Sequence, residues 1–100
     1  GQDIMEIKCE ISVNIDSEQF YKYAIDDYIG NKSYYVKCGF TTFKTFLTNS
    51  TYIRHWLDMR ANTAHYSNDY EIILLNNKLY DKVEKALTDY AIRRYEGAKF

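Results

Sequence analysis

Residues 5–15, with the sequence MEIKCEISVNI, alternate apolar and polar side chains through all eleven positions. Successive side chains of a β-strand point to opposite faces, so such a segment has one apolar face and one polar face. The pattern predicts a strand with one buried side over 5–15, and it argues against an all-helical bundle.

The length and composition of the chain are typical of one folded domain. A chain of 100 residues can bury a core without disulfides or metal. Its 46% hydrophobic and 17% aromatic content excludes a disordered tail. We expect a single domain over 5–100, with residues 1–4 as a remnant of expression. Neither a signal peptide nor a membrane-spanning run occurs, so we expect a cytoplasmic protein without a membrane partner.

The first helix is expected directly after the strand, over 17–29. Apolar residues recur there at helical spacing, on a broad face. Asp16 or Ser17 can cap this helix, and Gln19 follows Asp16 by three positions, as in a capping box. Gly30 is a natural helix stop.

The middle of the chain is expected to contain one strand and two helices. Residues 34–40 include several aromatic side chains and predict a second strand. Thr41-Thr42 can open a short helix, and Ser50 can cap another helix whose apolar residues recur at i, i+3 and i+4.

The last third contains one ambiguous segment and one long helix. Residues 71–75 include four consecutive aliphatic side chains, which suit a short buried strand, but they also continue a helical stripe into the next segment. We favour a strand over 70–75, followed by Asn76 or Asn77 as the cap of a helix over 78–95 that ends at Gly97. The expected fold class is α+β: a small antiparallel or mixed sheet of two to four strands, packed by three or four helices.

Motifs of metal and cofactor sites are missing from the sequence. Cys9, Cys38, His55 and His65 include no pair with a standard zinc spacing, so no metal site is predicted. No glycine-rich phosphate loop and no nucleophile elbow is present, so we expect no cofactor and favour a protein that is not an enzyme.

One short string is similar to a catalytic element. Arg60-Ala61-Asn62-Thr63-Ala64-His65 resembles the Arg-x4-His element of the HEPN (higher eukaryotes and prokaryotes nucleotide-binding) ribonucleases. The resemblance implies that His65 transfers a proton and that Arg60 stabilises phosphate charge during RNA cleavage. That family is all-helical, unlike a chain with a strand over 5–15. A HEPN-like ribonuclease is our second alternative function.

The last helix offers a nucleic-acid alternative. Lys78, Lys82 and Lys85 fall along one side of it, and tyrosines could stack on bases. Acidic residues interleave with these lysines, and the net charge of the chain is −1. On the strength of the lysines, a nucleic-acid-binding accessory domain is our first alternative function.

The preferred interpretation is a small protein-binding module. The chain has eleven tyrosines, more than its core is expected to bury, and residues 1–30 carry seven acidic and two basic side chains. Glu6, Glu10, Tyr34 and Tyr35 are the candidate partner-binding residues. The codon usage implied by abundant Ile, Lys, Asn and Tyr suggests an AT-rich genome, as of a phage or mobile element. An inhibitor of a host defence protein such as a nuclease fits this description, and a homodimer joined strand to strand is a further option.

Overall fold

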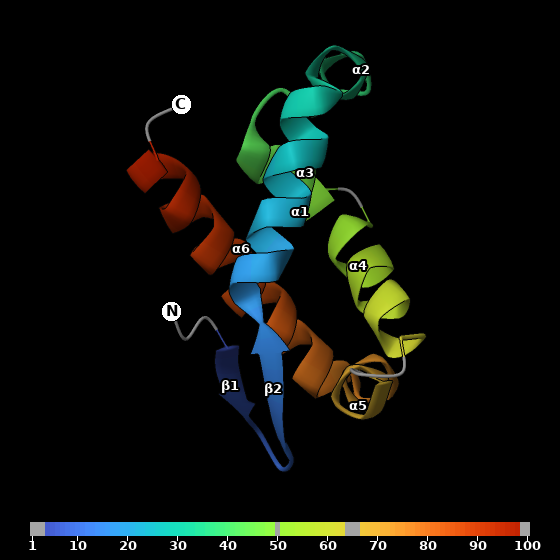
Figure 1. The fold of residues 1–100 in the computed structure, drawn as a ribbon. Coiled ribbons are helices and arrows are strands. Elements are labelled where there is room, and N and C mark those ends of the chain that lie inside the picture. The colour runs from blue at the N-terminus through green and yellow to red at the C-terminus, as the bar shows by residue number, and fades with distance from the viewer. Residues whose placement is uncertain (1–3, 50, 64–66, 99–100) are drawn as a thin grey trace.

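The computed structural model describes residues 4–49, 51–63 and 67–98. It has the expected small α+β fold, with a two-stranded antiparallel sheet followed by six helices in the described part of the chain (Figure 1). The elements in chain order are β1 (Ile4–Lys8), β2 (Ser12–Asp16), α1 (Ser17–Gly30), α2 (Lys32–Lys37), α3 (Phe43–Asn49), α4 (Tyr52–Ala61), α5 (Ser67–Leu75) and α6 (Asn77–Ala98).

The predicted strand over 5–15 is in fact a hairpin. β1 and β2 pair in antiparallel register, with Ile7 opposite Val13, and the Cys9 N–H donates to the Ile11 carbonyl (3.1 Å) across a turn centred on Glu10. The prediction of one continuous strand was wrong. The sequence did not reveal the turn, because the turn contains no Gly, Asn or Pro, the residues that usually signal one. Each odd-numbered residue of β1 is paired with an odd-numbered residue of β2. The apolar residues of both strands therefore lie on the same face of the hairpin, and Val13 and Ile15 face the core as the alternation predicted.

Three helix caps form as the sequence predicted or allowed. In each, a side-chain oxygen accepts from the backbone N–H three residues later: Asp16 from Gln19 (3.0 Å), Thr42 from Thr45 (3.1 Å) and Asn76 from Leu79 (3.1 Å). Ser50 lies outside the described residues, and Thr51 precedes α4 without a side-chain capping bond. Helix α6 continues through Gly97, where we expected it to end.

The second predicted strand, over 34–40, is helix α2 and its C-terminal cap. The N–H of Phe40 donates to the Tyr35 carbonyl (2.9 Å) and the N–H of Gly39 to the Val36 carbonyl (3.0 Å), which is the Schellman pattern of a helix end. Gly39 has φ +97°, a conformation that favours glycine. The aromatic content suggested a strand, whereas Gly39 was the signal of a helix end.

The strand favoured over 70–75 is also a helix, α5. A strand beside β2 would have needed free backbone groups along the outer edge of β2. The outer edge of β2 is instead satisfied by side chains of α5: the N–H of Asn14 donates to Asp69 Oδ2 (3.2 Å) and the N–H of Asp16 to the Tyr70 hydroxyl oxygen (3.1 Å). The helical stripe in the sequence was therefore the better guide than the run of aliphatic residues.

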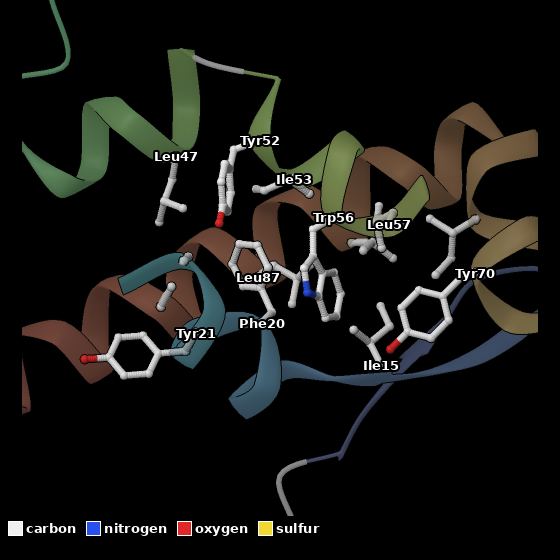
Figure 2. Close-up of a cluster of buried hydrophobic side chains, with 14 of the residues drawn as sticks. Ile15, Phe20, Tyr21, Leu47, Tyr52, Ile53, Trp56, Leu57, Tyr70 and Leu87 are labelled. Carbon is white, nitrogen blue, oxygen red and sulfur yellow. The ribbon is translucent and has the colours of Figure 1, made fainter. Parts of the chain in front are cut away.

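One core joins the hairpin to helices α1, α3, α4, α5 and α6 (Figure 2). Trp56 of α4 is 1% exposed and lies edge-on to Phe20 (ring centres 5.2 Å apart) and to Tyr70 (5.6 Å). Ile15 and Leu87 are fully buried around them. Aromatic rings that meet edge-on attract each other in addition to the stabilisation that comes from burying their area. This cluster is therefore expected to contribute strongly to the stability of the core.

Candidate functional site

Helix α2 lies at one end of the molecule (Figure 1). None of its residues is buried. Tyr34 is 64% exposed, Val36 is 42% exposed and Ile29, in the last turn of α1, is 48% exposed. We call α2 and the last turn of α1 the α1–α2 corner. Exposed large apolar side chains that recur over a few residues, here on two consecutive helices, are typical of a contact surface.

The two adjacent tyrosines of α2 have different roles. Tyr34 points away from the body, whereas the Tyr35 ring packs on Phe46 (4.6 Å between ring centres) and lies parallel to Tyr28 at 6.3 Å. The Tyr35 hydroxyl donates to Asp27 Oδ2 (3.0 Å). Burial and this carboxylate raise the pKa of Tyr35 to about 12, so the phenol stays protonated at neutral pH. Tyr35 therefore anchors α2, and Tyr34 is left for contact.

A hollow of about 320 Å³ opens beside Tyr35, where α1, α2, α3 and α4 meet. We call it the tyrosine hollow. Its lining residues are Asp27, Tyr35, Phe46, Thr51, Tyr52 and His55. They include one carboxylate and neither lysine nor arginine, so an occupant with a positive charge would be favoured.

Asp27 is held in a fixed position within the hollow. Its Oδ1 accepts from Asn31 Nδ2 (2.8 Å) and its Oδ2 from Tyr35. Burial raises the pKa of Tyr52, and the Asp27 carboxylate, which interacts with the Tyr52 hydroxyl, adds to the shift; this hydroxyl also donates to the Tyr23 carbonyl (3.4 Å). A carboxylate has about four acceptor positions, so Asp27 retains capacity for a further donor. Aromatic rings beside a carboxylate suit an ammonium or guanidinium group, which also interacts with ring faces.

The four residues predicted to bind a partner do not form one site. Glu6 lies in β1 and Glu10 at the tip of the hairpin, whereas Tyr34 and Tyr35 lie on α2 at the opposite end of the molecule (Figure 1). Sequence reasoning could not connect Asp27 with Tyr52 and His55, because they meet only when α1 packs beside α4.

The lysines of the nucleic-acid alternative are all exposed on α6. Lys82 Nζ donates to the Lys8 carbonyl (3.3 Å). Lys85 lies in a shallow groove beside Glu84 and Asp89, which reduce its field. Acidic side chains thus lie among these lysines, whereas a phosphate backbone is bound best by a continuous basic surface.

The ribonuclease alternative rests on a pair of which the structure places one member. Arg60 lies in the last turn of α4, with its guanidinium 5.4 Å from the centre of the Trp56 ring. His65 lies outside the described residues. The structure therefore does not give the geometry of the Arg60–His65 pair.

Side chains that can ligate a metal are spread over residues 4–49, 51–63 and 67–98. Within these ranges, no group of three His, Cys, Asp or Glu side chains is arranged to hold a metal ion. Cys9, beside the hairpin turn, and Cys38, after α2, are both free thiols.

An ion pair that the sequence did not reveal joins α1 to α6. Glu18 accepts from Arg94 Nε at Oε1 (2.8 Å), from Arg94 Nη2 at Oε2 (2.5 Å) and from the Tyr90 hydroxyl (2.6 Å). The Arg94 hydrogen bonds lower the pKa of Glu18 to about 2, although burial opposes the shift. The Arg94 guanidinium also lies over the Tyr21 ring, 4.8 Å from its centre. Both carboxylate oxygens of Glu18 are engaged, which indicates a structural role.

Comparison with protein-family models, with curated proteins and with solved structures gives no match. Among the described helices, none has the length and apolar character needed to cross a bilayer.

Proposed function

We propose that the protein is a non-enzymatic protein-binding module that contacts its partner through the α1–α2 corner. The observation that carries this proposal is the exposure of Tyr34 and Val36 on α2, a helix that buries none of its own residues, together with the exposure of Ile29 at the end of α1. Tyrosine is enriched at protein interfaces because it supplies a large contact area with few rotatable bonds.

The tyrosine hollow supports a partner with a basic surface. In this proposal, a lysine or arginine of the partner enters the hollow and pairs with Asp27 between the aromatic rings. Nucleases bind nucleic acid and present basic surfaces, so a host defence nuclease inhibited by a phage or mobile-element protein is the specific form of the proposal.

The test begins with capture of a partner on the tagged protein from the cells in which it naturally occurs. The captured protein is then purified and titrated against variants by calorimetry. Tyr34→Ser is expected to weaken binding at least tenfold, the range of an interface hot spot. Leu75→Ser is the matched control, since Leu75 is 87% exposed but lies on α5.

A second pair of variants tests the hollow. Asp27→Asn keeps the shape of the side chain and removes its charge, whereas Asp26→Asn removes a charge next to it that does not line the hollow. We expect only Asp27→Asn to weaken binding and to reduce its salt dependence. Equal affinity of Tyr34→Ser and wild type would refute the proposal. Capture of nucleic acid that depends on Lys78, Lys82 and Lys85 would replace it with the first alternative.

A further inference from the structure

The outer edge of β1 carries backbone groups that β2 does not use. The N–H groups of Asn14 and Asp16 point to α5, and that of Cys9 points to Ile11. In an antiparallel pair, hydrogen-bonded and non-hydrogen-bonded positions alternate. The odd positions of β1 therefore bond to β2, and the even positions direct their N–H and C=O groups outward.

Ile4, Glu6 and Lys8 are these outward positions, and each side chain is exposed. Within the described residues, no other strand pairs with β1, which forms a border of the molecule in Figure 1. The Lys8 carbonyl accepts from Lys82 Nζ at 3.3 Å, and a carbonyl oxygen can accept a second bond. A free edge of this kind can be extended by another strand.

We propose that β1 pairs antiparallel with β1 of a second copy of the chain, with Glu6 opposite Lys8 of the second copy and Lys8 opposite its Glu6. The two hairpins then form one four-stranded sheet with twofold symmetry. This inference is independent of the α1–α2 corner, which lies at the other end of the molecule.

Charge selects this register among those that the backbone allows. Outward positions must oppose outward positions for the ladder to form. Centring the pair on Glu6 would place two carboxylates opposite each other, which destabilises a sheet. Centring it on Met5 would leave Glu6 opposite Ile4. Centring it on Ile7 gives two pairs of opposite charge, and each pair exchanges both backbone hydrogen bonds.

The inward face supports the same centre. Met5 and Ile7 are only half-buried in one copy, and Ile7 packs against its core. With the axis at Ile7, the two Ile7 side chains become neighbours, and Met5 lies opposite Cys9 of the second copy. Ile7 occupies a non-hydrogen-bonded pair, in which Cα atoms lie about 4.5 Å apart. The half-buried apolar residues thus cover one another in the dimer.

A charge exchange tests the proposal without altering the core, with sedimentation equilibrium as the measurement. Glu6→Lys and Lys8→Glu each place like charges opposite each other twice, so each is expected to weaken dimerisation about tenfold. The double variant Glu6→Lys/Lys8→Glu restores opposite charges and is expected to recover the wild-type dissociation constant. Glu6 also accepts from the Ser12 hydroxyl (2.7 Å), and the double variant lacks this bond too, so recovery reports the new pairs alone.

Cysteine cross-linking tests the register directly. In a Cys9→Ser/Cys38→Ser background, Ile7→Cys is expected to form a disulfide-linked dimer on mild oxidation, because a separation of about 4.5 Å suits a disulfide. Met5→Cys is the control, since the two Met5 positions would lie more than about 10 Å apart. Cross-linking through Met5→Cys but not Ile7→Cys would overturn the register. A monomer at millimolar concentration, with cross-links in neither variant, would overturn the dimer.

Discussion

The core around Trp56 and the α1–α2 corner are both rich in aromatic residues, but they use them differently. Trp56 has ring neighbours on both sides and almost no exposure, whereas Tyr34 has one ring neighbour and is 64% exposed. Beside the core, the Glu18–Arg94 pair ties α1 to α6. The difference predicts that stability resides in the core and that side chains of the corner contribute little to it.

The largest effect is expected from truncating aromatic residues in the two regions. Trp56→Ala removes a buried indole and leaves a cavity, so it should lower the free energy of unfolding by about 3–5 kcal/mol. Tyr34→Ala should change it by less than about 0.5 kcal/mol, since the side chain is largely in water. Urea unfolding followed by circular dichroism measures both values. Similar losses of stability in the two variants would contradict the difference between the core and the corner.

The second-largest effect is expected from removing the charge of Glu18. Glu18→Gln leaves Arg94 without its anionic partner, and because Arg94 is 43% exposed and can be hydrated, we expect a loss of about 2 kcal/mol at neutral pH. The exposed Asp26→Asn, on the same helix, should have almost no effect. Urea unfolding of both variants measures the two losses.

The contribution of Glu18 should also depend on pH with a definite sign. Its pKa is about 2 in the folded state, below the usual value of 4.5, so the stabilisation is complete above pH 5. It is lost as the pH falls from 4.5 towards 2, where the carboxylate is protonated. The difference between wild type and Glu18→Gln should therefore shrink over this range, and a difference that stays constant down to pH 2 would contradict the assignment.

A smaller effect is expected at the glycine that ends α2. Gly39 has φ +97°, and a Cβ added there meets nothing within 4 Å, so Gly39→Ala should cost about 1 kcal/mol through backbone strain alone. Gly30→Ala is the matched control, because Gly30 is helical and equally open. It should leave stability unchanged or raise it slightly. Thermal unfolding of the two variants measures both effects. A loss of stability in both variants would show that backbone strain at Gly39 is not the cause.

The parts of the fold that the sequence predicted well are those with local causes. Helix α1 and the start of α6 follow from periodicity and from caps at Asp16 and Asn76, which act within a few residues. The errors at 34–40 and 70–75 came from weighing strand propensity over helix signals. Propensity gives way to tertiary context, here the α5 side chains that occupy the edge of β2.

The candidate site was less predictable because its residues are distant in sequence. The sequence predicts Tyr34 and Tyr35 as one pair of contact residues, yet Tyr34 is largely exposed and Tyr35 anchors α2 on Asp27. Which face of α2 is inward depends on the packing of α2 against Phe46, and no local pattern encodes that contact. Composition indicated an excess of tyrosine, and only the fold shows where it is exposed.

Amide hydrogen exchange of the free protein is the most direct test of a stable core joined to a separable corner. The account predicts that amides of α2, such as that of Tyr35, exchange through local opening, well before those in the interiors of α4 and α6. Protection of α2 equal to that of α4 and α6 would contradict it, because the corner would then unfold only together with the core.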